Sequence, residues 1–180
     1  MRVLLNIPNI LTILRIIVIP AFITCMLYER YDYALYLFAF AALTDKLDGF
    51  IARRLNEKTE FGTFLDPLAD KFMLVSAFIL LAIKKLIPLW LVIMAISRDI
   101  IVVTGWFIIF LITKDSKVET LPTGKLAIAS QFLLICFFLL HINYDILDFM
   151  EMPFIFITAI LTVLSGLHYI HRGLKITSAE

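Results

Sequence analysis

Four aspartates stand beside apolar runs in the stretch DKLDGFIARRLNEKTEFGTFLDPLAD. Asp45 and Asp48 are three residues apart and Asp66 and Asp70 are four apart, so each pair would share one face of a helix. Clustered carboxylates repel one another unless a cation neutralises them, and hard oxygen ligands favour Mg²⁺, Mn²⁺ or Ca²⁺ over zinc. The spacing therefore predicts a divalent-metal site built from two helices. The alternative is that these aspartates only pair with neighbouring basic residues at a solvated helix end.

Small residues accompany the first aspartate pair. Gly49 and Ala52 follow Asp45 by four and seven residues, on the same helical face, and Arg53 comes directly after them. Such a bare face lets a bulky ligand approach the metal and the backbone. A metal together with an arginine neutralises phosphate oxygens, so the pattern favours a phosphorylated substrate.

The composition is that of a membrane protein. The chain of 180 residues is 62% hydrophobic with a mean hydropathy of +0.97, against about 45–50% apolar residues in a typical soluble domain. Sixteen basic and fifteen acidic residues give a net charge of +1. A nucleic-acid-binding domain would show a strongly basic face, so that class is excluded.

Six apolar stretches approach the roughly 20 residues that a membrane span needs. The second must run into the aspartate motif and on through Ala52 or Arg53, because its apolar part is too short alone. Gly62 is the expected turn residue, and Pro67 is expected in the first turn of the third helix. The predicted fold class is all-α, a polytopic bundle of six transmembrane helices forming one domain over residues 1–180. The predicted spans are Ile10–Leu27, Tyr33 into the motif, Pro67–Lys84, Pro88–Ile112, Gly124–His141 and Pro153–Tyr169.

Lysine and arginine near the span ends predict the orientation. With the N-terminus in the cytoplasm, the basic loops after the second and fourth spans and the C-terminal tail all lie inside, and only Arg30, Lys84 and Lys85 lie outside. Both termini and the aspartates are therefore expected on the cytoplasmic side of the cell membrane. The first apolar run has no small-residue cleavage site, so we expect a retained span rather than a signal peptide.

The aspartate stretch consists of DKLDGFIAR, eight further residues, and GTFLDPLAD. It resembles the signature of the CDP-alcohol phosphotransferase family, which is D-x-x-D-G-x-x-A-R followed after eight residues by G-x-x-x-D-x-x-x-D. Every fixed position is present, and the six-helix layout extends the resemblance over essentially the whole chain. The resemblance implies a membrane-embedded enzyme in which an alcohol attacks the diphosphate of a CDP-linked lipid and releases CMP. It also implies a homodimer.

The resemblance assigns roles by position. Asp45, Asp48, Asp66 and Asp70 would hold Mg²⁺ or Mn²⁺, and Asp70 would also take the proton of the attacking hydroxyl. The cytidine and diphosphate of CDP-diacylglycerol would be received by Gly49, Ala52, Arg53 and Thr59.

The N-terminal stretch NIPNILTILRIIVIP resembles the first helix of the family's bacterial phosphatidylglycerolphosphate synthases, whose acceptor is glycerol 3-phosphate. One helical face carries three polar residues spaced three positions apart, Asn9, Thr12 and Arg15. This face is expected to help close the nucleotide cavity. The alternative is that Asn9 and Thr12 only cap a helix and Arg15 snorkels to the interface.

An anionic acceptor also needs cations. Arg98, about ten residues into the fourth span, and Lys125, at the start of the fifth, are expected to bind the acceptor phosphate. Asp99 is expected to point away or to pair elsewhere. Snorkelling is the alternative for Lys125.

The chain departs from that branch in having Trp106, Ala127 and Ile128 where further basic residues and a threonine are usual. This departure, with the stretches SRDIIVV and SGLHYIHRG, favours a second hypothesis, a cardiolipin synthase of the same family that uses phosphatidylglycerol as acceptor. A third, from a different class, is a non-catalytic membrane protein or a transporter with a divalent-ion site. Transporters often show internal repeats, and the acidic cluster occurs once.

Overall fold

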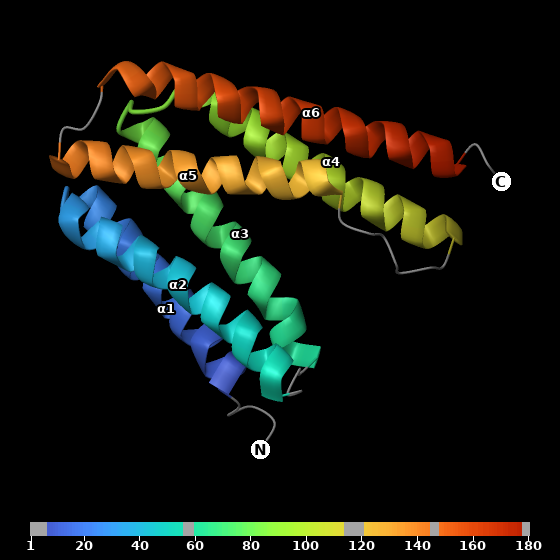
Figure 1. The fold of residues 1–180 in the computed structure, drawn as a ribbon, viewed down its shortest axis with the longest axis horizontal. Coiled ribbons are helices and arrows are strands. Elements are labelled where there is room, and N and C mark those ends of the chain that lie inside the picture. The colour runs from blue at the N-terminus through green and yellow to red at the C-terminus, as the bar shows by residue number, and fades with distance from the viewer. Residues whose placement is uncertain (1–6, 56–59, 114–120, 145–147, 178–180) are drawn as a thin grey trace. The chain divides into compact units, whose positions relative to one another are not determined.

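The computed structural model describes residues 7–55, 60–113, 121–144 and 148–177, and the side chains of residues 13–44, 68–108, 111, 121–144 and 148–175. Within those ranges the chain forms helices and no strand, which confirms the all-α prediction (Figure 1). The helices are α1 (Ile7–Leu27), α2 (Tyr31–Leu55), α3 (Glu60–Ile83), α4 (Leu89–Thr113), α5 (Pro122–Tyr144), the short 3₁₀ helix η2 (Asp148–Met150) and α6 (Glu151–Thr177).

Most helix bounds follow the predicted spans. The α2 helix continues through Arg53, as expected, and Pro88 and Pro153 lie just before α4 and in the first turn of α6. Prolines suit these positions because the first-turn N–H groups have no partner inside a helix.

The predicted start of the third helix is wrong. The α3 helix begins at Glu60, so Gly62 is helical rather than a turn residue, and Pro67 lies eight residues into the helix. A proline removes only one bond of the helical ladder, and an acidic residue such as Glu60 is favourable at a helix N-terminus. The helix therefore begins about two turns before Pro67, and it includes Asp66.

The chain forms two compact units, and the first comprises Met1–Ile83 with Cys136–Ile146. In this unit α1 packs against both α2 and α3. The Phe22 and Phe38 rings, both fully buried, lie 5.9 Å apart between α1 and α2. Glu29, with φ of 60°, ends α1, and the Arg30 N–H donates to the Cys25 carbonyl at 2.8 Å. This closing bond allows α2 to begin at once.

The second unit comprises Lys84–Ile135 with Leu147–Glu180, and in it α4 packs against α6. Buried polar side chains link α5 to α6. The Gln131 amide donates to Thr162 Oγ1 at 3.3 Å, and the Thr158 hydroxyl donates to the Ser130 carbonyl at 3.4 Å. Buried polar groups are stable only when hydrogen-bonded, so these contacts fix how the two helices pair.

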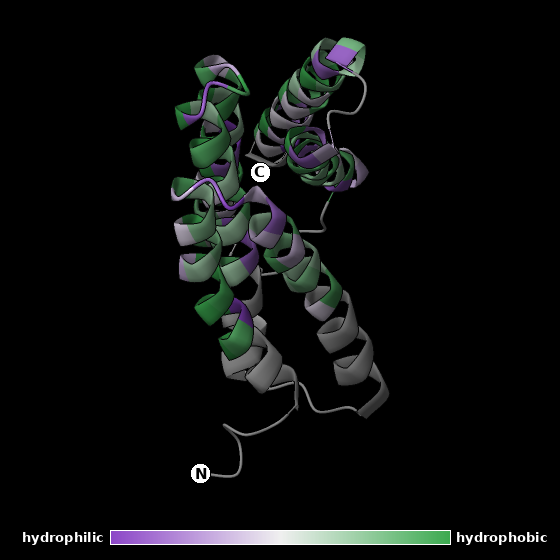
Figure 2. Cartoon of the chain, turned by 90° about the vertical axis from the view of Figure 1, so that its left-hand side faces the viewer, coloured by the Kyte–Doolittle hydropathy of each residue, from purple (hydrophilic) through white to green (hydrophobic). Residues whose placement is uncertain are grey.

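Three helices among the described residues are long and apolar enough to cross a membrane: Leu89–Ile108, Pro122–Tyr144 and Asp148–Lys175. Ile13–Leu27 is a shorter apolar helix. Figure 2 shows apolar residues along the described turns of the helices and hydrophilic residues at several connections. Large apolar side chains such as Ile93, Val103 and Ile160 are exposed. Helices that are apolar nearly all round are typical of membrane spans, so the chain is a membrane protein.

Candidate active site

The four aspartates lie at matching levels of two consecutive helices. Asp48 is seven residues before the end of α2 and Asp66 six residues after the start of α3, about 10 Å along each helix at 1.5 Å per residue. Asp45 and Asp70 are each ten residues from those ends, about 15 Å by the same rise. Only residues 56–59 join the two helices, so the two pairs lie at equal distances along their helices from this connection.

The donor chemistry of this set suits a divalent cation. All four side chains carry hard carboxylate oxygens, the ligands that Mg²⁺ and Mn²⁺ prefer. Among the side chains that the structure describes, no group of three or more histidines, cysteines or acidic residues forms a competing metal site. The register and the donor type therefore fit a metal held between α2 and α3.

Several predicted site residues are only partly described. For most of these residues the structure describes the backbone, which lies in α1, α2 or α3, and not the side chain. Thr59 lies outside the described residues entirely. The residues whose side chains are not described are Asn9, Thr12, Asp45, Asp48, Gly49, Ala52, Arg53 and Asp66.

Asp70 is the one aspartate of the set whose side chain the structure describes, and it contacts α1. The Arg15 Nη1 donates to Asp70 Oδ1 at 2.7 Å. The Arg15 side chain is 1% exposed and that of Asp70 is 40% exposed. The snorkelling alternative for Arg15 is thus wrong, because the guanidinium turns into the protein to reach a carboxylate 55 residues away.

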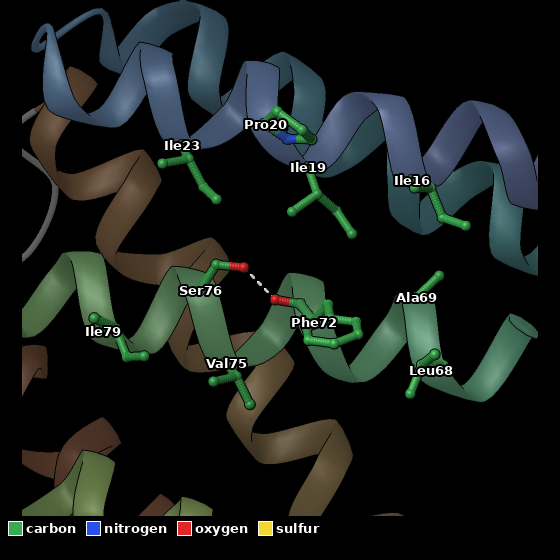
Figure 3. Close-up of a pocket in the computed structure, with 10 residues that line it drawn as sticks. All are labelled: Ile16, Ile19, Pro20, Ile23, Leu68, Ala69, Phe72, Val75, Ser76 and Ile79. Atoms are coloured by element: carbon green, nitrogen blue, oxygen red, sulfur yellow. Dashed lines mark hydrogen bonds between the residues drawn. The ribbon is translucent and has the colours of Figure 1, made fainter.

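An apolar groove begins beside this ion pair. It runs between α1 and α3 and has a volume of about 610 Å³ (Figure 3). The Ser76 hydroxyl within it donates to the Phe72 carbonyl of its own helix. The groove is lined by Ile16, Ile19, Pro20, Ile23, Leu68, Ala69, Phe72, Val75, Ser76 and Ile79.

Arg98 forms a second polar centre, within the unit that contains α4 and α6. It is 5% exposed, and its Nε and Nη2 both donate to Ser165 Oγ, at 3.1 and 2.8 Å. Its Nη1 donates to Asp99 Oδ1 at 2.9 Å. The prediction that Asp99 points away from Arg98 is wrong, since the long arginine side chain reaches its neighbour on α4.

The guanidinium of Arg98 also lies against the start of α5. It is 5.6 Å from the centre of the Tyr169 ring, and the Leu121 N–H donates to Tyr169 Oη at 3.2 Å. A Cβ on Gly124 would be 3.0 Å from Arg98 Nη2. Lys125, the next residue, is exposed. The structure thus brings Arg98 to the helix turn that carries Lys125.

The model of the CDP-alcohol phosphatidyltransferase family matches residues 5–164 of this sequence. The chain belongs to that family. The match includes the four aspartates, Arg15, Arg98 and Lys125.

Curated relatives carry two names. The chain is 34% identical to the CDP-diacylglycerol–glycerol-3-phosphate 3-phosphatidyltransferase of Bacillus subtilis, over 93% of this chain and 95% of the relative. The protein of the same name from Pseudomonas fluorescens is 48% identical, over 54% of this chain and 53% of the relative, so that match spans about half of each. The cardiolipin synthase (CMP-forming) of Rattus norvegicus is 41% identical over 67% of this chain and 38% of the relative.

Sequence reasoning missed three contacts of these polar centres: Arg15 with Asp70, Ser165 with Arg98, and Tyr169 with the start of α5. A charged side chain inside an apolar run needs a partner, which is a signal that Arg15 and Arg98 each have one. Only helix packing identifies which residue that partner is.

We expect Gly124→Ala to destabilise the fold. An added Cβ would lie 2.9 Å from Tyr169 Oη and 3.0 Å from Arg98 Nη2, and such overpacking typically costs about 1–3 kcal/mol. Gly105→Ala and Gly173→Ala are matched controls in α4 and α6, because a Cβ there meets nothing within 4 Å. These controls should keep or raise the thermal midpoint in detergent, since alanine favours helices. A Gly124→Ala variant as stable as the controls would contradict the close approach.

Proposed function

We propose that the chain transfers the phosphatidyl group of CDP-diacylglycerol to glycerol 3-phosphate and releases CMP, as a CDP-diacylglycerol–glycerol-3-phosphate 3-phosphatidyltransferase of phospholipid biosynthesis. The observation that carries the proposal is the 34% identity to the Bacillus subtilis protein of that name over nearly the full length of both chains. The complete aspartate signature at matching levels of α2 and α3 supports it.

The proposed roles divide between the two polar centres. Asp45, Asp48, Asp66 and Asp70 hold Mg²⁺ or Mn²⁺, which when bound supplies positive charge to the diphosphate oxygens. The cytidine and diphosphate are bound by Asn9, Thr12, Gly49, Ala52, Arg53 and Thr59.

Asp70 acts as the base in this proposal. As the acceptor hydroxyl oxygen forms a bond to the phosphatidyl phosphorus, its proton passes to the Asp70 carboxylate. The bond from that phosphorus to the CMP oxygen breaks, and CMP leaves with the electron pair. The 40% exposure of the Asp70 side chain is compatible with direct contact with the hydroxyl.

Arg98 and Lys125 bind the phosphate of glycerol 3-phosphate. Arginine carries five N–H donors, and Ser165 and Asp99 engage three of them through Nε, Nη2 and Nη1. Lys125 is exposed one residue beyond Gly124, so its ammonium can meet an anion that approaches the start of α5.

We also propose six transmembrane spans, with both termini in the cytoplasm, in the cell (cytoplasmic) membrane, and a homodimer. The lengths of α2 and α3, 25 and 24 residues, correspond to about 36 Å or more, enough for a hydrocarbon core about 30 Å thick. The excess of lysine and arginine in the expected cytoplasmic loops supports the orientation.

Cardiolipin synthase activity is the second candidate, supported by the 41% identity to the Rattus norvegicus enzyme and by Trp106, Ala127 and Ile128. The deciding experiment measures CMP release by the purified chain in detergent with CDP-diacylglycerol and Mg²⁺, comparing glycerol 3-phosphate with phosphatidylglycerol. Release that requires glycerol 3-phosphate and stops with EDTA supports the proposal. Release only with phosphatidylglycerol makes the chain a cardiolipin synthase, and no release with either contradicts both.

The groove between α1 and α3 is suited to one acyl chain of the lipid donor, because its walls are apolar and include Ala69, next to Asp70. We expect Ser76→Phe to raise the KM for long-chain CDP-diacylglycerol about tenfold, since displacing two methylenes loses about 0.8 kcal/mol each. The KM for a short-chain analogue should not change. Val103→Phe, at an exposed apolar position outside the groove, is the matched control. An equal effect on both chain lengths would contradict this use of the groove.

A further inference from the structure

The sequence places Arg15 on the face expected to help close the nucleotide cavity, and the structure shows it among the largest fully buried side chains. A buried guanidinium is unfavourable unless a carboxylate compensates it, and α3 supplies Asp70. We propose that Arg15 is a positioning residue, which holds the Asp70 carboxylate in the orientation used for the transfer. This inference rests on the proposed function.

The unequal exposure of the two partners separates their roles. Asp70 is 40% exposed, so a substrate hydroxyl can reach it, whereas Arg15 is 1% exposed and closed to the substrates. The 2.7 Å contact from Arg15 Nη1 to Asp70 Oδ1 is at the short end for a charge-assisted hydrogen bond. Arg15 therefore acts on Asp70 and not on the substrates.

The surroundings make the pair rigid. The neighbouring residues Ile16 and Ala69 both line the apolar groove, and α1 packs along α3. An ion pair beside apolar walls is screened less than one in water. One carboxylate oxygen of Asp70 is thus fixed to α1, which limits rotation of the group about its side-chain torsions.

The test is a kinetic comparison of Arg15→Met, Arg15→Lys and wild type, with CDP-diacylglycerol and glycerol 3-phosphate in detergent. Misplacing a reacting group by about 1 Å can lower a rate about 10²-fold, so Arg15→Met should lower kcat about 10²-fold and leave both KM values nearly unchanged. Arg15→Lys keeps the charge without the planar fork, and its kcat should be intermediate. Arg30→Met is the matched control, since Arg30 is exposed and its ion pair with Asp32 spans 3.7 Å; its kcat should equal that of wild type.

A double-mutant cycle with Asp70→Asn separates positioning from a general structural role. If Arg15 acts through Asp70, Arg15→Met should cause no further fall in kcat once Asp70 is replaced. A full 10²-fold loss in that background, or a wild-type kcat for Arg15→Met alone, would overturn the inference. Arg15→Lys carries the test if Arg15→Met does not fold. A wild-type chain that releases no CMP would overturn the proposed function as well, so the two failures are distinguishable.

Discussion

Replacing Asp70 by asparagine is expected to lower CMP release by about 10²- to 10⁴-fold, the range that a positioned general base contributes. Asparagine keeps the shape of the side chain, whereas it takes no proton and is a weaker ligand for a hard cation. The measurement is the rate of CMP release with both substrates saturating. A folded Asp70→Asn variant with the wild-type rate would contradict the proposed base role.

The control for this variant must account for Arg15. Asp70→Asn also removes the carboxylate that compensates a guanidinium of 1% exposure, so some loss of stability is expected. The thermal midpoint in detergent therefore has to be measured beside the rate. Asp32→Asn is the matched control, because its pair with Arg30 is exposed at both partners and such pairs contribute little. It should leave both the rate and the midpoint unchanged.

The sequence predicted most helices because long apolar runs with prolines at their starts are strong local signals. It misplaced the start of α3 because it treated Gly62 and Pro67 as helix punctuation, although both lie inside the helix. The acidic residue type at Glu60 favours an earlier helix start, and one missing ladder bond at Pro67 did not outweigh the residues on either side. Single-residue signals were less reliable here than the four-residue spacing of Asp66 and Asp70.

The sequence predicts those features of the candidate site that depend on spacing within a helix. The levels of the two aspartate pairs followed from residue counts, whereas the partner of Asp70 depends on how α1 packs against α3. Arg15 stands 55 residues from Asp70, and no local pattern relates them. The contact between Arg98 and Asp99 was missed for a different reason. Adjacent side chains on an ideal helix point in different directions, yet the flexible side chain of Arg98 reaches the Asp99 carboxylate.

The second large effect is expected at Arg98, which pairs with Asp99 and, in the proposal, binds the acceptor phosphate. Measuring the thermal midpoint and the KM for glycerol 3-phosphate separates these two roles. Arg98→Leu leaves the Asp99 carboxylate, 16% exposed, without its guanidinium, and breaking a buried pair on one side costs about 3–5 kcal/mol. The thermal midpoint should fall accordingly. Arg98→Leu combined with Asp99→Leu should recover most of this loss, because apolar replacement of both partners of a buried pair is often neutral or stabilising.

The recovered double variant then isolates the acceptor role. If Arg98 binds the phosphate of glycerol 3-phosphate, the KM for that substrate should stay raised about tenfold or more, since a hydrogen bond to a charged group contributes about 1.5–3 kcal/mol. The KM for CDP-diacylglycerol should be near that of wild type, because its proposed site lies on α1 to α3. Ser165→Ala is the matched control: it removes one partner of Arg98 and keeps the charge. A stable double variant with the wild-type KM for glycerol 3-phosphate would make Arg98 a packing residue of α4 and α6, and the acceptor phosphate would then depend on Lys125.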